Sequence, residues 1–113
     1  MGKFKGTEGE FVTAATAGLL QTTYLKGKRC TGNPDPIRGE FFGIEQIKKL
    51  FGKTGCKGIR IYHGEDEKGE PKLILVAVDE NANKLVKDKT GLKGDGDDDH
   101  LANGPKCPQE CGQ

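Results

Sequence analysis

The sequence predicts a small α+β domain in which two helices pack on a small antiparallel β-sheet, followed by a loop-rich C-terminal tail. Two segments repeat apolar residues at helical spacing, and two later segments have the pattern of strands separated by a polar loop. Leucine, isoleucine, valine and phenylalanine make up 24 of the 113 residues, so the core is small. We expect a single domain over residues 1–87 and a tail rich in glycine, aspartate and cysteine over residues 88–113.

The first helix is expected over residues 8–26. Thr7 and Glu10 match a capping box, in which each side chain bonds a backbone N–H that the start of a helix leaves without a partner. Apolar residues then recur every four positions from Phe11, and Gly27 is a typical helix stop. The pattern therefore predicts an amphipathic helix.

A second, shorter helix is expected over residues 43–51. Its apolar residues fall at positions i, i+3, i+6 and i+7 from Ile44, with charged residues opposite them. Gly52 follows and is expected to end the helix. Between the two helices, the closely spaced Pro34 and Pro36 predict a loop.

An antiparallel hairpin is expected over residues 58–78. Apolar and polar residues alternate over 59–62, and an unbroken apolar run occupies 73–78 after a glycine-containing loop. The unbroken run predicts a strand that is covered on both faces. Because two strands alone are marginally stable, a short third strand at 85–86, the tail or another subunit must complete the sheet. We expect residues 84–92 or another chain to cover the exposed edge.

Charge is distributed unevenly along the chain. Residues 1–60 carry a net charge of +6 and residues 61–113 one of −5, so the whole chain is close to neutral at +1. A near-neutral chain argues against nucleic acid as a partner, since nucleic-acid-binding domains are usually basic. Oppositely charged halves can attract each other within one fold or between two copies of the chain.

The sequence predicts neither a membrane span nor a secretory signal. No segment approaches the roughly 18 consecutive apolar residues of a membrane-spanning helix. The modestly apolar run 11–20 follows two glutamates instead of the basic region that a signal peptide has. The expected location is the cytoplasm, or the outside of the cell if the chain starts at a processed mature end.

Four stretches of the chain resemble a known family: GEFFG at 39–43, GCKGIRIYHG at 55–64, LILVAVD at 73–79 and CPQEC at 107–111. They are similar to a family of small uncharacterised proteins of Bacteroidota-type bacteria. The family has no established activity, so the resemblance implies no catalytic residue. It implies only which residues belong to the shared pattern, namely Cys56, Arg60, Tyr62, Cys107 and Cys111.

The aspartate-rich segment, where the chain departs from that family pattern, is a weak candidate for calcium binding. Asp95, Asp97 and Asp99 have the spacing of the first half of a calcium loop. The second half does not match, because position six is His100 instead of glycine and position twelve is Lys106 instead of glutamate. A solvated acidic loop is the alternative interpretation.

The four cysteines are compatible with disulfides, a zinc site or free thiols. Cys107 and Cys111 are close enough in sequence to pair and would close a small loop in a segment that lacks a core. Zinc sites usually combine two short-spaced pairs, whereas Cys30 and Cys56 lie 26 residues apart and Cys30 is outside the family pattern. In a reducing compartment the free thiols are favoured.

Arg60, Tyr62 and His63 are the candidate ligand or interaction residues of the hairpin. Strand alternation places Arg60 and Tyr62 on one face, where an arginine beside an aromatic ring can bind a carboxylate, stack on a planar ligand or simply pack. His63 could serve as a general base, but the sequence places no nucleophile near it.

The sequence predicts that this protein is not an enzyme, because it contains no catalytic constellation, phosphate-binding loop, dinucleotide-binding motif or zinc-protease motif. The expected function is a non-catalytic interaction or a self-assembling structural subunit. Its expected partner is the chain itself, as a homo-oligomer or filament, or another protein. The alternative is a module that binds calcium, zinc or a small ligand, and no cofactor is expected beyond the candidate calcium ion.

Overall fold

The computed structural model describes residues 2–30, 32, 37–86 and 99–107. Its two helices and three-stranded antiparallel sheet confirm the predicted α+β class. Residue contacts divide the chain into two compact units. The first unit consists of residues 1–8 and 42–104, and the second of residues 9–41 and 105–113.

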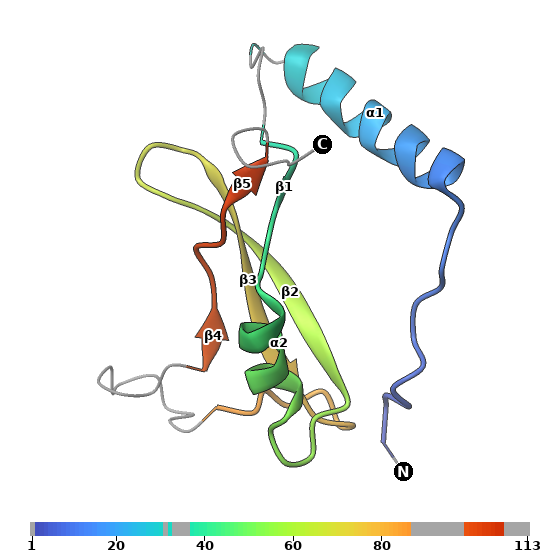
Figure 1. Cartoon of the computed structure of the whole chain (residues 1–113), viewed down its shortest axis with the longest axis vertical. Coiled ribbons are helices and arrows are strands. Elements are labelled where there is room, and N and C mark those ends of the chain that lie inside the picture. Colours follow the sequence, from blue (N-terminus) through green and yellow to red (C-terminus); the bar gives the residue numbers. More distant parts are fainter. Residues whose placement is uncertain (1, 31, 33–36, 87–98, 108–113) are drawn as a thin grey trace. The chain divides into compact units, whose positions relative to one another are not determined.

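The first unit is built on a sheet with the strand order β2-β3-β4. β2 spans Gly58–Glu65 and β3 spans Pro71–Val78, and Tyr62 lies opposite Ile74 in their antiparallel register. The two strands form the hairpin that the sequence predicts. The short β4, His100–Leu101, pairs with the other edge of β3 (Figure 1).

A tight loop joins β2 to β3. The Asp66 carboxylate accepts hydrogen bonds from the backbone N–H groups of Lys68 and Glu70, at 2.9 Å each. Gly69 has a φ of +83°, in the left-handed region where glycine pays no steric cost. These residues of the loop therefore fix the register of the hairpin.

The third strand comes from the tail, which is one of the three alternatives that the sequence leaves open for completing the sheet. In the described structure, residues 84–86 make one isolated bridge to β3, with Lys84 opposite Val78. Its two backbone hydrogen bonds run from the Leu85 N–H to the Ala77 carbonyl and from the Asp79 N–H to the Asn83 carbonyl, at 2.9 Å each. The strand itself is β4, in which Leu101 lies opposite Leu75. The tail therefore completes the sheet, as one of the expected alternatives, whereas the strand expected at 85–86 was wrong. The position of β4 within the tail could not be predicted, because a two-residue strand has no periodicity that a sequence could reveal.

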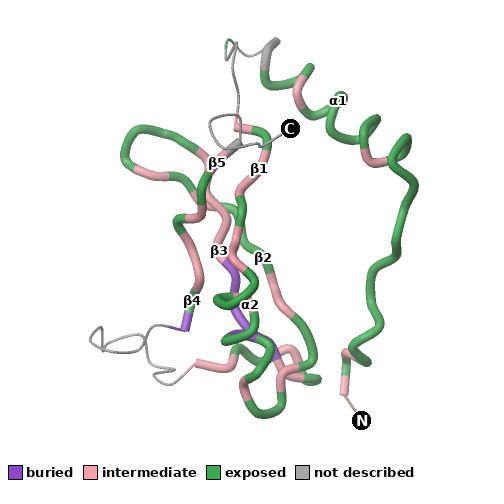
Figure 2. The backbone as a smooth tube through the Cα atoms, viewed as in Figure 1, coloured by how far each residue is buried: buried purple, intermediate pink, exposed green. Residues whose placement is uncertain are grey.

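The core of the first unit lies between α2 and β3. α2 spans Ile44–Phe51, as predicted, and the backbone N–H of Gly52 closes its last turn. Leu50 of α2 forms a buried cluster with Leu75 and Ala77 of β3 (Figure 2). Partly buried apolar residues surround this cluster: Phe42, Cys56, Ile59, Leu73, Leu85 and Leu101.

The second half of β3 is buried on both of its faces. Residues 75–78 are four consecutive buried positions, and successive side chains of a strand point to opposite faces. Leu75 and Ala77 belong to the cluster with α2, so Val76 and Val78 point to the opposite face. This agrees with the burial that the unbroken apolar run predicts.

The second unit contains α1 and a pair of short strands. α1 spans Ala14–Cys30, and β1, Gly39–Glu40, pairs antiparallel with β5, Lys106–Cys107. The Phe41 N–H also donates to the Pro105 carbonyl at 2.7 Å. Backbone pairing therefore orders part of a segment that the sequence describes as a tail.

Among the described residues, no helix combines the length and apolar character needed to cross a membrane.

The start and end of the first helix differ from the prediction. Thr13 caps α1, because its Oγ1 accepts a hydrogen bond from the Thr16 N–H at 3.1 Å. Gly9 has a φ of +93°, which an α-helix cannot contain. The capping box of Thr7 and Glu10 was therefore wrong, and the helix also continues through the predicted glycine stop.

Candidate functional site: the arginine face and outer edge of β2

The two faces of β2 differ in chemistry. Residues directly opposite each other in an antiparallel pair lie on the same face of the sheet. Ile59 lies opposite Ala77 and therefore on the side of the core. Arg60 lies opposite Val76 and shares the other face with Tyr62, as the sequence predicts. We call this second face the arginine face.

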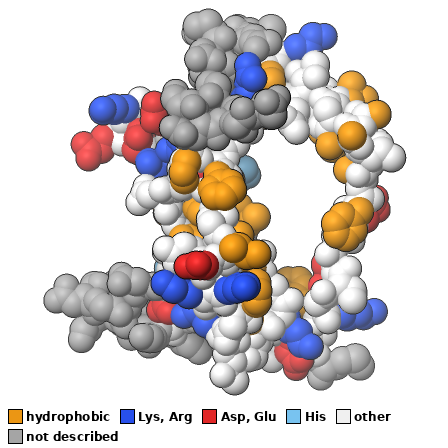
Figure 3. All heavy atoms as spheres, in the orientation of Figure 1, with side chains coloured by type: hydrophobic (Ala, Val, Ile, Leu, Met, Phe, Trp, Pro, Cys, Tyr) orange, Lys and Arg blue, Asp and Glu red, His pale blue; other side chains and the backbone are white. Residues whose placement is uncertain are grey.

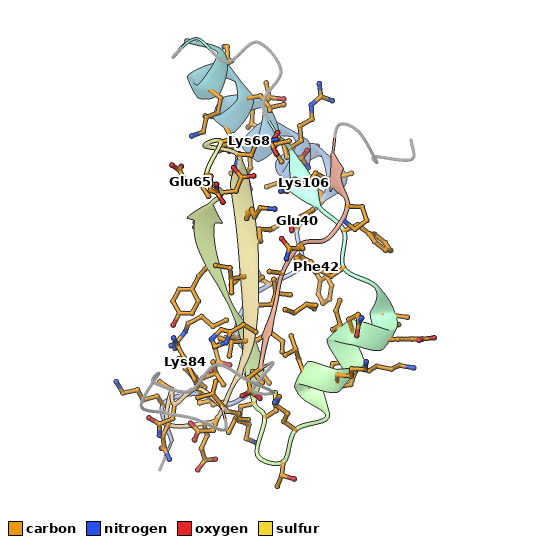
Figure 4. The ribbon with its side chains drawn as sticks, turned by 90° about the vertical axis from the view of Figure 1, so that its left-hand side faces the viewer. Glu40, Phe42, Glu65, Lys68, Lys84 and Lys106 are labelled. Carbon is orange, nitrogen blue, oxygen red and sulfur yellow. The ribbon has the colours of Figure 1, made fainter. Side chains whose placement is uncertain are left out.

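Two cations contact aromatic rings on this side of the first unit. The guanidinium carbon of Arg60 lies 5.9 Å from the centroid of the Phe4 ring. The ammonium nitrogen of Lys84 lies 4.9 Å from the centroid of the Tyr62 ring. Both distances are in the range of cation–π attraction. Figure 4 shows Lys84 near the end of the hairpin that is opposite to the loop carrying Lys68.

An N-terminal arm brings Phe4 to β2. The Phe4 N–H donates to the Glu80 carbonyl at 2.9 Å, which attaches the arm to the turn after β3. The Glu8 carboxylate then accepts hydrogen bonds from the N–H groups of Lys5 and Gly6, at 2.7 and 2.9 Å. These bonds close a compact turn in the arm, so Glu8 organises this turn and begins no helix.

A pocket with a volume of about 360 Å³ lies between this arm and the hairpin. The space beside Gly58 is open, since a Cβ atom placed there would meet no atom within 4 Å. Pockets that bind small organic molecules usually have volumes of about 300–1,000 Å³, so this pocket is large enough for such a ligand. The residues that line it all belong to the first unit: Phe4, Gly6, Glu8, Lys57, Gly58, Ile59, Arg60 and Val78.

Positive charge exceeds negative charge along the pocket. Lys57 and Arg60 line it with one cation each, and Glu8 contributes one carboxylate. The hydrogen bond from the Lys5 backbone N–H is the main cause that lowers the pKa of Glu8 below its ordinary value. Glu8 is therefore ionised at neutral pH, and the lining carries a net charge of +1.

The hydroxyl of Tyr62 is affected by two cations. Its pKa is lowered, first because the Arg60 guanidinium hydrogen-bonds to the phenol oxygen and then because the Lys84 ammonium lies nearby. Both groups stabilise the negatively charged phenolate. The same arrangement is suited to holding an external anion on this face.

β2 is also an edge strand. Within the described residues it pairs only with β3, so its outer backbone N–H and carbonyl groups face away from the sheet. The side chain of Ile61, on this strand, is 54% exposed. Further apolar side chains reach the surface around α2, including Ile44 and Phe51 (Figure 3). An open edge that carries an exposed apolar side chain, here Ile61, is a typical site of strand addition.

His63 does not join the arginine face. It lies opposite Leu73 in the register and therefore on the side of α2, with its side chain exposed. The structure thus separates His63 from Arg60 and Tyr62, although the three residues are close in sequence.

Of the aspartates that the sequence singles out for calcium, the structure describes only Asp99. Asp99 is 3% exposed, and its carboxylate pairs with the Lys53 ammonium at 2.5 Å. Asp95 and Asp97 lie outside the described residues. Among the residues that the structure does describe, no group of three or more histidine, cysteine, aspartate or glutamate side chains could hold a metal ion.

Cys56 is a free, half-buried thiol, and its Sγ donates to the Gly58 carbonyl at 3.4 Å. Cys111 lies outside the described residues. Cys30 ends α1 and Cys107 ends β5, but only the backbone of these two residues is described. The disulfide between Cys107 and Cys111 therefore stays a prediction.

Sequence reasoning missed Phe4, Lys57 and Lys84 as parts of this site. Phe4 precedes the first element that the sequence predicts, and Lys84 lies near Tyr62 because residue 84 bridges to Val78. These contacts are made by the tertiary fold, which periodicity does not reveal. Strand alternation gave the one signal that was available, the shared face of Arg60 and Tyr62.

Comparison with known proteins gives no significant match to any family model, curated protein or solved structure. The resemblance to proteins of Bacteroidota-type bacteria therefore stays a prediction.

Proposed function

We propose that this protein is a non-catalytic, self-associating structural subunit in which the outer edge of β2 pairs with the same edge of a second copy. The observation that carries this proposal is the self-complementary order of side chains along β2 and its flanking lysine. The open edge supplies backbone hydrogen-bonding groups, and the side chains determine which strand fits.

A two-fold axis at Ile61 gives a favourable antiparallel register. Ile61 then lies opposite Ile61 of the second copy, and Arg60 lies opposite Tyr62. At both ends of the contact, Lys57 lies opposite Glu65, which brings opposite charges together. Apolar, cation–aromatic and opposite-charge pairs across strands each contribute roughly 0.2–1 kcal/mol. In this register, each charged side chain therefore lies opposite either an aromatic ring or a side chain of opposite charge.

Neighbouring registers that keep the same faces together are less favourable. An axis at Arg60 places two guanidinium groups directly opposite each other, and like charges in that position are destabilising. An axis at Tyr62 places Ile59 opposite Glu65, so an apolar side chain faces a carboxylate. The chain therefore favours the axis at Ile61.

Pairing about a two-fold axis uses the same edge on both copies and leaves no free β2 edge. Such an isologous contact closes, which favours a dimer over a filament. The sheets of the two copies would join into one continuous antiparallel sheet. Self-complementarity also favours a second copy over an unrelated protein as the partner.

The mass of the full chain in solution, measured by analytical ultracentrifugation over a range of concentrations, tests this proposal. We expect the wild type to shift from monomer to dimer as the concentration rises. Ile61→Lys should remain a monomer, because two lysines would face each other at the axis. Ile61 is largely exposed, so the variant should keep the circular dichroism spectrum of the wild type.

Ile44→Lys is the matched control, since Ile44 is an isoleucine on α2, outside the β2 strand, that is 67% exposed. It should dimerise as the wild type does. A wild-type chain that stays monomeric at low salt and high concentration would contradict the proposal. So would two lysine variants that dimerise equally well.

A further inference from the structure

We propose that the pocket between the N-terminal arm and β2 binds a small organic monocarboxylate with a planar or apolar body. This inference does not depend on self-association, because the pocket lies within the first unit of one chain. Two features together carry it: the cavity of about 360 Å³ and the cations that gather around it.

Arg60 is suited to hold the carboxylate. A guanidinium presents a planar set of N–H donors that matches the two oxygens of a carboxylate. The Phe4 ring lies on one side of this guanidinium, at 5.9 Å, and the Tyr62 hydroxyl also interacts with it. These contacts restrict the orientation of the arginine side chain and reduce the entropy that binding would cost.

The uncharged part of the pocket is suited to an apolar body. The Phe4 ring and the Val78 side chain contribute apolar surface, and Gly58 contributes no side chain at all. A planar ring is the shape that stacks on a guanidinium or an aromatic side chain. A ligand that combines such a ring with a carboxylate would use both parts of the lining.

The charge of the lining favours a monoanion over a dianion. The lining contains two cations, Lys57 and Arg60, and one ionised carboxylate, Glu8. A single negative charge on the ligand therefore neutralises the lining. A phosphate dianion would leave an excess of negative charge near Glu8. The pocket should therefore prefer a carboxylate to inorganic phosphate.

Titration of the full chain with benzoate, followed by the chemical shifts of backbone amides, tests this inference. We expect saturable shifts in residues 57–60 and in the arm. Benzamide has the same shape without the charge, and acetate has the charge without the ring, so both should bind more weakly. Inorganic phosphate should also bind more weakly than benzoate.

Two pairs of variants locate the site. Arg60→Gln should weaken benzoate binding about tenfold or more, because a charge-assisted contact is lost, whereas Arg38→Gln in the second unit should not. Phe4→Ala should weaken binding while Phe11→Ala, at a fully exposed phenylalanine, should not. Phe4 is outside the β2 edge, so its variant separates ligand binding from self-association.

The inference is overturned if benzoate causes no saturable shifts. It is equally overturned if benzamide or phosphate binds as tightly as benzoate. A third contrary result would be an affinity for benzoate that Arg60→Gln and Phe4→Ala leave unchanged.

Discussion

Single residues explain where the first helix begins. The sequence contains two threonine positions that could cap it, Thr7 and Thr13, and only Thr13 does so. The difference lies in Gly9, whose positive φ interrupts any helix that begins at Thr7. A capping pattern in a sequence does not report the φ of a glycine inside it, so the pattern alone does not distinguish the two threonines.

Replacing Thr13 with alanine should destabilise α1. The substitution removes the Oγ1 that accepts the Thr16 N–H, and loss of such a cap typically costs about 1 kcal/mol. Helicity measured by circular dichroism during thermal unfolding checks this expectation. Thr7→Ala is the control and should leave the unfolding curve unchanged; a larger effect at Thr7 would contradict the assignment.

Ionisation of Tyr62 should occur at a lower pH than that of an ordinary tyrosine. Arg60 and Lys84 lower its pKa in the folded chain, so folding favours the phenolate. The stabilisation that results is present only at alkaline pH, above the ordinary pKa, and is lost as the pH falls through the lowered folded pKa. It contributes nothing at neutral pH.

Tyrosinate absorbance during an alkaline titration measures this pKa. A Tyr24→Phe background leaves Tyr62 as the single tyrosine, since the chain has two. Arg60→Gln and Lys84→Gln should each move the ionisation of Tyr62 to higher pH. An unchanged titration in both variants would show that these cations do not act on the hydroxyl.

The elements of the first unit differ in how far the sequence could predict them. α2 was predicted because its apolar residues follow the helical period. The hairpin was predicted from the alternation over 59–62 and the unbroken apolar run over 73–78. The tail was one of the segments expected to complete the sheet, but the position of β4 within it was not predicted, because β4 consists of two residues that are identified only by their pairing with β3. The residues of the arginine face differ in the same way. Strand alternation predicted that Arg60 and Tyr62 share a face, whereas the contact of Lys84 with Tyr62 depends on the tertiary fold.

Leu101→Asp should detach β4 from the sheet. Leu101 packs against the core cluster and lies opposite Leu75, so a buried charge there is unfavourable. We expect a loss of about 1–3 kcal/mol in the free energy of unfolding and faster hydrogen exchange of the Leu75 amide, which faces β4. Asn103→Asp, at an exposed position of the same segment, is the control. Equal stabilities of both variants would contradict a structural role for β4.

At the scale of the whole molecule, the proposed function rests on what the sheet leaves uncovered. β4 covers one edge of β3, and β2 covers the other but leaves its own outer edge open within the described residues. The sequence carries a net charge of +6 over residues 1–60 and −5 over residues 61–113, which is compatible with attraction within one fold or between two copies. The proposal places the contact at Lys57, Ile61 and Glu65.

The most direct test of self-association through β2 uses two variants of the same residue. Ile61→Lys and Ile61→Glu should each be monomeric, because each places like charges opposite each other at the two-fold axis. Mixed in equal amounts, they should form a dimer that contains one chain of each, since lysine then lies opposite glutamate. Native mass spectrometry distinguishes this mixed dimer from either homodimer. A mixture that remains monomeric while the wild type dimerises would contradict the proposed register, and dimers of either variant alone would contradict the contact itself.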